Sequence, residues 1–507
     1  MPRRAGRPAA PARGGIHNRT GARMVFSSPF FLFLFLPLAL LGNFLLPARA
    51  RNGFLLAASL LFYAWGEVFY VGVMLASIAA NHACGLLLAR AATARGRRLV
   101  LWAAVAFNLG LLGWFKYGGF LAANLGAALG ALGCAPLPAL ETHLPIGISF
   151  FTFQAMSYVI DVYRGQAAAQ RSLVNLALYV SLFPQLIAGP IVRYRDVAAQ
   201  LLRRHVDLDG FAEGVRRFVV GLGKKMLLAN ALGEVADQIM AQEPGALPAS
   251  VAWLGIGCYA LQIYFDFSGY SDMAIGLGRM FGFRFLENFA HPYAAASMRD
   301  FWRRWHISLS TWFRDYLYIP LGGGRVAPWR VACNLWIVFL LCGLWHGASW
   351  NFVIWGALHG LFLSLERTAF GRLVDGLWRP LRHGYVLVVV LVAWVFFRVE
   401  ELPRALDYLW AMTGAGAAGL AGGAGGLGAG AYLPREKLLT LLAAVAFALP
   451  WAPALGRARA LLARWSGPAV PAWGPEALRT LGLLAVLALS LLHVASATYN
   501  PFIYFRF

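Results

Sequence analysis

A single histidine stands inside an almost wholly apolar stretch of this sequence, LLCGLWHGASWNFVIWG, which covers residues 340–356. An ionisable side chain in a segment suited to a lipid bilayer is costly, so by default it marks a functional site. Imidazole titrates near neutral pH and accepts a proton well when it is held beside a hydroxyl group. We therefore predict that His346 is a general base, with a hydrogen-bonding linker between helices as the alternative.

A second histidine, His306, also follows a tryptophan, in the segment MRDFWRRWHISLSTWFRDYLYIPLGGGR at residues 298–325. This segment is dense in Arg and Trp and is amphipathic, which is typical of an interfacial or re-entrant helix. The glycines at 322–324 predict the turn that bounds it. His306 is either catalytic or shapes the approach to His346, and the sequence leaves both interpretations open.

Carboxylates and hydroxyls gather in LQIYFDFSGYSDMAIGLGRMFGF, residues 261–283, which otherwise has the composition of a membrane span. Its repeated glycines permit helices to pack closely. We predict that Asp266, Ser268 and Asp272 form a supporting network rather than the catalytic group, with the two carboxylates paired to arginines of the following segment. The expected partners are Arg303, Arg304 and Arg314.

The tryptophans beside the two histidines have two interpretations. Trp305, Trp345 and Trp350 either wall a chamber that excludes water from the reacting groups or anchor the chain at the lipid interface. Both interpretations place aromatic rings near His306 and His346, so the sequence does not separate them.

The sequence does not indicate a metal or a bound cofactor. His346 and His359 are 13 residues apart, about 220° around a continuous helix, so they would not share a face. His359 is therefore expected to be structural. The five cysteines are scattered without a CxxC pair. No GxSxG elbow, Walker loop, HExxH or dinucleotide-binding glycine pattern occurs.

The elements that must position these residues are membrane helices. Of the 507 residues, 60% are hydrophobic and 13% are charged, against roughly 25% charged in soluble domains. Backbone in lipid must satisfy its own hydrogen bonds, which predicts an all-α polytopic fold with roughly 11–13 transmembrane or re-entrant helices. The expected spans cover residues 30–46, 54–80, 99–118, 144–160, 173–190, 215–240, 251–278, 331–345, 347–366, 384–399, 437–452 and 479–497.

The formal net charge is +22, and basic residues cluster in short loops between spans. This pattern is typical of positive-inside topology in a multi-pass protein embedded in membrane lipid. Binding to nucleic acid would need a soluble basic face, and the sequence has none. The basic loops could also attract a polyanionic ligand at the cytoplasmic face.

The chain divides into a short extension and one membrane domain. Residues 1–23 hold six arginines and no acid, and we interpret them as a disordered basic extension or a start assigned too early, ahead of Met24. Residues 24–507 form the membrane domain, interrupted by a Gly/Ala-rich segment at 414–431 that is typical of a flexible loop.

Several stretches resemble the membrane-bound O-acyltransferase (MBOAT) family, in its branch of membrane subunits for bacterial alginate O-acetylation. The resemblance covers most of residues 24–400 and the last few residues, and it weakens between about 400 and 490. The stretches are MVFSSPFFLFLFLPL, NLGLLGWFKYGGF, LPIGISFFTFQAMSYVIDVYRG, LFPQLIAGPIVRYRD, YFDFSGYSDMAIGLGRMFGFRFLENF, FWRRWHISLSTWFRDYLYIPLGG, GLWHGASWNFVIWGALHG and NPFIYFRF.

The resemblance implies a helical fold around an intramembrane catalytic funnel, with the near-invariant family histidine at His346 and the second motif histidine at His306. It implies transfer of an acyl group, usually acetyl, from a cytoplasmic donor such as acetyl-CoA across the bacterial inner membrane towards an exopolysaccharide such as alginate. A periplasmic acetyltransferase partner and the polysaccharide assembly machinery are the partners it implies.

The ending YNPFIYFRF suggests a further role. If this aromatic tail enters the chamber, the Tyr504 phenol could receive the acetyl group and pass it to a partner, because a phenol is a feasible nucleophile once a base takes its proton. The alternative is an aromatic belt at the interface.

Two functions of other classes remain open from the sequence. A transporter of a polysaccharide precursor or acyl carrier would suit many spans with a polar midplane, although the inverted repeats expected of one are absent. A non-catalytic scaffold of a secretion complex would tolerate the loss of His346.

Overall fold

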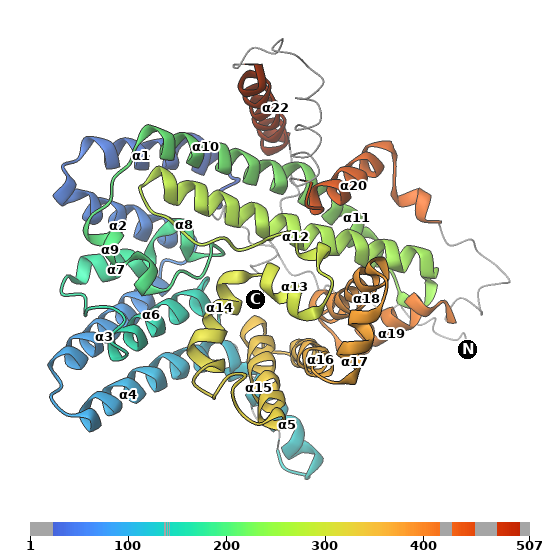
Figure 1. The fold of residues 1–507 in the computed structure, drawn as a ribbon, viewed down its shortest axis with the longest axis horizontal. Helices are drawn as coiled ribbons and strands as arrows, with labels where there is room; N and C mark the ends of the chain where they lie inside the picture. The colour runs from blue at the N-terminus through green and yellow to red at the C-terminus, as the bar shows by residue number, and fades with distance from the viewer. Residues whose placement is uncertain are drawn as a thin grey trace, which may run out of the picture.

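The computed structural model describes residues 24–135, 138, 140, 142–415, 428–451 and 474–496. Within these ranges the regular elements are helices and no strand occurs (Figure 1). The extension at residues 1–23, most of the Gly/Ala-rich segment and the tail that carries Tyr504 lie outside the described residues. The all-α prediction is confirmed.

The helices follow one another through short connections. The first half contains α1 (Leu36–Leu45), α2 (Ala48–Ala64), α3 (Tyr70–Arg90), α4 (Ala94–Leu112), α5 (Gly118–Ala131), α6 (Ile148–Tyr163), α7 (Leu173–Ser181), α8 (Phe183–Leu186), α9 (Tyr194–Leu202), α10 (Leu208–Gly223) and α11 (Asn230–Met240). The second half contains α12 (Ala249–Met280), α13 (Met298–Arg304), α14 (Ile307–Phe313), α15 (Pro328–His346), α16 (Trp350–Leu365), α17 (Ala369–Gly376), α18 (Arg379–Arg398), α19 (Leu402–Thr413), α20 (Arg435–Ala448) and α22 (Gly474–Ser496).

Four of these helices run into one-turn π-helical segments, in which the backbone is locally wider. They are η1 (Phe31–Phe35), η2 (Gly113–Tyr117), η3 (Lys224–Ala229) and η6 (Arg314–Tyr318). Short 3-10 turns also occur: η4 (Pro244–Ala246), η5 (Pro292–Ala294) and η8 (Ala429–Tyr432). Single π turns occur often at functional sites, and η2 and η3 each carry a buried lysine.

In the described part of the chain, five helices are long and apolar enough to cross a membrane: Tyr70–Arg90, Ala94–Ala131, Pro328–His346, Arg379–Arg398 and Glu476–Ser496. Phe31–Leu45 and Trp350–Leu365 are shorter apolar helices. The chain is therefore a polytopic membrane protein. The single span expected over 54–80 is wrong, because α2 ends at Ala64 and α3 begins at Tyr70, with the buried carboxylate of Glu67 in the connection.

The long helix α12 packs along α10, and Figure 1 shows the two side by side. Glycine permits this close approach: a Cβ atom on Gly276 would lie 2.6 Å from the carbonyl oxygen of Gly214, and one on Gly221 would lie 2.5 Å from that of Gly269. The close packing predicted from the glycines of residues 261–283 is confirmed.

Helices α15 and α16 form a tight hairpin broken at residues 347–349. A Cβ atom on Gly343 would lie 2.2 Å from the carbonyl oxygen of Phe352, so only glycine fits at this crossing. The break makes His346 the last residue of α15. The histidine thus stands where one helix ends and the chain turns back.

The segment predicted as one interfacial or re-entrant helix is two short helices. Ser297 caps α13 by accepting a hydrogen bond from the Asp300 N–H at 3.0 Å. The chain then leaves the helix at Trp305, and His306 adopts the left-handed conformation with φ 43° and ψ 54°. A residue with a side chain rarely adopts this conformation, which is found most often at turns and functional sites. The predicted turn is present, with positive φ at Gly322 and Gly323.

Candidate active site

The fold brings His306 and His346 together, although they are 40 residues apart in the sequence. Their ring centroids lie 6.4 Å apart at an angle of 59°. Both side chains are buried, with exposed fractions of 0% and 2%. One histidine stands at the left-handed turn between α13 and α14, and the other ends α15.

The orientation of His306 is set by Asn288. Its Nδ1 lies 3.1 Å from Asn288 Oδ1, and that oxygen also accepts from the N–H of Ser308 at 3.2 Å and its hydroxyl at 2.9 Å. The Asn288 amide nitrogen donates to Ser271 Oγ at 3.0 Å, so the amide oxygen must face the imidazole. In the neutral ring Nδ1–H therefore donates, and Nε2 holds a lone pair.

Nε2 of His306 is buried and has no hydrogen-bond partner among the residues that the structure describes. The ring packs edge-on against Phe267, with centroids 4.7 Å apart, and against Trp345 at 6.0 Å. A lone pair held in this way can accept a proton or a hydrogen bond from a substrate.

The His346 ring is held by aromatic packing. Its centroid lies 5.0 Å from Trp355, 5.1 Å from Phe397 and 5.0 Å from Trp345. Both ring nitrogens are buried without a partner within the described ranges. Buried polar atoms are nearly always paired in native proteins, so these two nitrogens are available to bond a substrate or a water molecule.

His359 belongs to the wall rather than to this pair. Its Nδ1 accepts a hydrogen bond from the indole N–H of Trp302 at 3.2 Å, and Trp355 stands between it and His346, with centroids 4.6 and 5.0 Å away. The expected separation of 220° assumed one continuous helix and is wrong, because the hairpin places His359 on α16. No group of three or more possible metal ligands lies together in the described residues.

The expected partners of the two aspartates are wrong. Asp266 pairs with Lys225 at 2.5 Å, and Asp272 pairs with Lys224 at 2.6 Å and Arg217 at 2.8 Å. The cations come from α10 and η3, which pack against α12. The arginines of residues 298–325 do not pair with either aspartate.

Those arginines have other contacts. Arg304 pairs with Asp300 at 2.9 Å, and Arg314 pairs with Asp315 at 2.7 Å. Arg303 lines a cavity together with Arg299. Ser268, the third member of the expected network, has a buried hydroxyl and lines a second cavity.

The wall of the chamber differs from the expected one at one tryptophan. Trp305 and Trp345 are buried, with exposed fractions of 2% and 4%, whereas Trp350 is 55% exposed. The indole N–H of Trp350 donates to Asn124 Oδ1 at 3.0 Å on the outside of the protein. Trp355, which the sequence did not single out, packs against His346 instead. Trp350 is the first residue of α16 and points outward.

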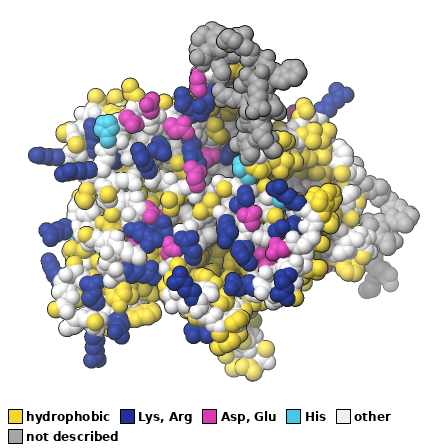
Figure 2. Space-filling model, viewed as in Figure 1, with side chains coloured by type: hydrophobic (Ala, Val, Ile, Leu, Met, Phe, Trp, Pro, Cys, Tyr) yellow, Lys and Arg dark blue, Asp and Glu magenta, His cyan; other side chains and the backbone are white. Residues whose placement is uncertain are grey.

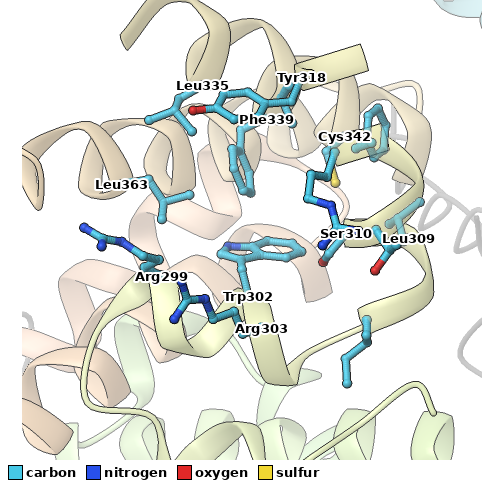
Figure 3. A pocket seen from close by; sticks show the side chains of 15 residues that line it. Arg299, Trp302, Arg303, Leu309, Ser310, Tyr318, Leu335, Phe339, Cys342 and Leu363 are labelled. Atoms are coloured by element: carbon cyan, nitrogen blue, oxygen red, sulfur yellow. The ribbon is translucent and has the colours of Figure 1, made fainter. Parts of the chain in front are cut away.

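A cavity of about 400 Å³ opens between α13–α14 and α15–α16. Figure 3 shows Arg299 and Arg303 on one side of it, with the ring of Trp302 extending towards Phe339. Cys342, one helical turn before His346, also lines it. The cavity therefore has a basic rim and reaches α15 one turn before His346.

A larger cavity of about 710 Å³ lies between α10, α12 and α22. It reaches Ser271 and Asn288, the two residues that orient His306 from behind, and Arg216, Lys224 and Arg479 line it. Cations thus line both cavities, and each cavity reaches a residue close to one of the two histidines, Cys342 near His346 and Asn288 beside His306.

Two features of the site were missed by reasoning from sequence. Asn288 lies in an irregular segment without periodicity, so nothing marks its amide as a partner of His306. Lys116 stands inside the long apolar span Ala94–Ala131, and a charge in such a span is the signal that could have found it.

Comparison with known proteins places this site in a family. The family model for membrane-bound O-acyltransferases matches residues 142–399, which include both histidines, the three buried wall tryptophans and Asn288. The chain is 48% identical to the probable alginate O-acetylase of Azotobacter vinelandii over 77% of this chain and 78% of that protein.

Further relatives match along most of the length. Identity is 41% with the probable alginate O-acetylase of Pseudomonas aeruginosa, over 96% of this chain and all of that protein. Identity is 37% with the peptidoglycan O-acetyltransferase of Helicobacter pylori, over 78% of this chain and 81% of that protein. With its buried histidine pair in the matched region, the chain belongs to the membrane-bound O-acyltransferase family and is an O-acyltransferase.

Proposed function

We propose that this chain takes an acetyl group from a cytoplasmic thioester and passes it across the bacterial inner membrane for O-acetylation of an exopolysaccharide. One observation carries the chemistry: two buried imidazoles lie with their ring centroids 6.4 Å apart, and three of their four nitrogens have no hydrogen-bond partner in the described residues. Relatives named alginate O-acetylases support acetyl as the group and an exopolysaccharide as its destination.

His346 acts as the general base. It takes the proton of an acceptor hydroxyl while the hydroxyl oxygen attacks the acetyl carbonyl carbon. The new C–O bond forms, the C–S bond of the thioester breaks, and the departing thiolate receives the proton from the imidazolium. The attacking hydroxyl has one proton, which goes to His346, so His306 Nε2 accepts a hydrogen bond from a second hydroxyl of the acceptor and thereby orients it. The aromatic wall excludes water, which would otherwise hydrolyse the thioester.

The donor enters through the 400 Å³ cavity, and acetyl-CoA is the donor that its chemistry suits. Arg299 and Arg303 stand one turn apart on α13 and line it, and within the described ranges neither side chain is in an ion pair. Arginine binds phosphate well, so these two residues hold the phosphates of the donor while its thioester arm reaches past Trp302 and Cys342.

The donor side is the cytoplasmic side. Figure 2 shows Lys and Arg side chains spread across the face on which α13 and α14 lie, and cytoplasmic surfaces of membrane proteins carry an excess of these residues. The acceptor side is then periplasmic, where an acetyltransferase partner and the polysaccharide assembly machinery take over the acetyl group.

The Tyr504 relay stays a prediction, since its residue lies outside the described residues. A Tyr504→Phe variant tests it: loss of polymer acetylation at normal protein level supports the relay, and full acetylation contradicts it. No feature of the fold or of the relatives favours the transporter alternative.

The deciding experiment is complementation of a deletion strain. The gene is restored as wild type or as His346→Ala at matched membrane levels, and ester-linked acetyl is measured on the purified exopolysaccharide. Loss of the ester only in His346→Ala supports the proposal. An ester that persists in His346→Ala but is absent from the deletion strain contradicts a catalytic His346.

A further inference from the structure

The last turn of α15 ends in four backbone carbonyls that have no partner within the helix, as at the end of any α-helix. The Gly343 carbonyl accepts from the Gly347 N–H at 3.2 Å. The Leu344 carbonyl accepts from the Tyr117 hydroxyl at 2.6 Å. The Trp345 and His346 carbonyls both accept from Lys116 Nζ, the second at 3.2 Å. Two neighbouring side chains from another helix thus complete the turn that carries His346.

Lys116 uses its whole capacity for this. An ammonium group has three donors and no acceptor, and the third donates to Ser149 Oγ on α6 at 3.2 Å. The side chain is 8% exposed and lies in η2, within the span Ala94–Ala131. Its charge faces the negative end of the α15 dipole, which favours a cation there. No donor is left for a substrate, so Lys116 does not touch the reacting atoms.

His346 has unusual need of such support. Catalytic and metal-binding histidines are commonly oriented by a hydrogen bond to one ring nitrogen. Here neither nitrogen has a partner in the part of the chain that is described, and the ring direction depends on aromatic packing and on the backbone beneath it. Helix ends fray, so an unsupported final turn would let the imidazole move.

We propose that Lys116, assisted by Tyr117, is a positioning residue for His346: it fixes the C-terminal turn of α15 and thereby the direction of the imidazole. The proposal rests on the catalytic role of His346 proposed above. We call the hydrogen bonds from Lys116 and Tyr117 to the last carbonyls of α15 the clamp. In other enzymes a carboxylate orients a histidine by bonding its ring, whereas the clamp orients His346 by holding its backbone.

The test compares Lys116→Met with Lys116→Arg, and with Arg330→Met as matched control. Arg330 is exposed at the other end of α15, so its substitution removes a cation from the same helix far from the chamber. Initial rates of transfer of radiolabelled acetyl from acetyl-CoA to polymer are measured in inverted membrane vesicles of the producing host, at equal protein level.

We expect Lys116→Met to lower kcat about 100-fold, the effect of a small misplacement of a catalytic group, with KM for acetyl-CoA within twofold of wild type. Lys116→Arg recovers part of the rate, because it keeps a cation and donors at the helix end. Arg330→Met has wild-type kinetics. A Lys116→Met protein with kcat within twofold of wild type overturns the proposal.

A double-mutant cycle separates positioning from general structural support. In a His346→Ala background, Lys116→Met should lower the residual rate no further, because residues that act as a unit are non-additive. An independent further loss overturns the proposal. If His346→Ala itself keeps the wild-type rate, the proposed function fails and the positioning role of Lys116 fails with it, whereas a loss in His346→Ala with an additive Lys116→Met effect overturns the positioning role alone.

Should Lys116→Met not accumulate in the membrane, Tyr117→Phe decides. It removes one donor from the same turn and leaves the charge in place. A fall in kcat of about tenfold at unchanged KM, the size expected for one hydrogen bond, supports the clamp, and a wild-type kcat overturns it.

Discussion

Between α10–η3 and α12, Asp266 and Asp272 face cations at hydrogen-bonding distance, whereas the site at the end of α15 holds two imidazoles with three ring nitrogens that have no hydrogen-bond partner in the described residues. Both regions are polar and both lie deep in an apolar protein. In the first, Asp266 and Lys225 satisfy each other and join two helices. In the second, hydrogen-bonding capacity is left unused. The charged pairs of α12 join helices, whereas the ring nitrogens of His306 and His346 are available to a substrate.

The largest effect that would sharpen this contrast is expected from His346→Gln. The variant should lose about 1,000-fold or more of the acetyl-transfer rate, within the range that general base catalysis contributes. Its thermal unfolding in detergent should stay close to wild type, since no hydrogen bond of the described protein is lost. The comparison breaks if the variant is inactive only because it unfolds at a much lower temperature.

The reverse result is expected from the ion pair. Lys225→Met leaves the Asp266 carboxylate buried without its cation and should destabilise the protein by about 3–5 kcal/mol. The double variant Lys225→Met with Asp266→Asn removes both charges and should recover much of that loss. Thermal unfolding and membrane yield measure it. A double variant less stable than the single one would mean that the pair has a role other than charge neutralisation.

The contrast also explains what reasoning from sequence reached. Uncharged runs predicted helices because a lipid bilayer permits few other backbone structures. A histidine in such a run stood out because the cost of burying an ionisable group in lipid can be recognised from the sequence alone. The partners of Asp266 and Asp272 were predicted wrongly because they depend on which helices pack together. The glycines predicted that α12 packs closely, but not that α10 is its neighbour.

Breaks in the helices were the second limit. The interruptions at residues 65–69, 305–306 and 347–349 turn helices that periodicity alone would continue. They expose Trp350, bury Trp355 and place His359 behind the chamber. Asn288 was invisible for the same reason, because an irregular segment carries no periodic signal of where its side chains lie.

A smaller effect should follow from Asn288→Ala. This change removes the hydrogen-bond partner of His306 Nδ1, so the imidazole ring can rotate or change tautomer. Loss of such an orienting partner costs about 10–100-fold in activity. Asn334→Ala is the matched control, because Asn334 is also buried and donates to the carbonyls of Leu321 and Gly323 away from the chamber. Acetyl-transfer kinetics at matched protein level distinguish them. Equal losses in both variants would show that any buried asparagine has this effect.

The smallest effect on the acetyl-transfer rate is expected from substitution of Trp350, which is exposed, in contrast to the buried Trp355 of the same helix. Trp350→Phe removes the hydrogen bond to Asn124 at an exposed position and keeps an aromatic ring beside Phe120, so its acetyl-transfer rate should remain within about twofold of wild type, as for most surface substitutions. Trp355→Phe leaves a gap against His346 in a close-packed wall and should lower the rate several-fold more, because the ring it supports can shift and water can enter. A Trp350→Phe variant as impaired as Trp355→Phe would mean that the active site extends beyond the buried wall and includes the exposed N-terminal end of α16.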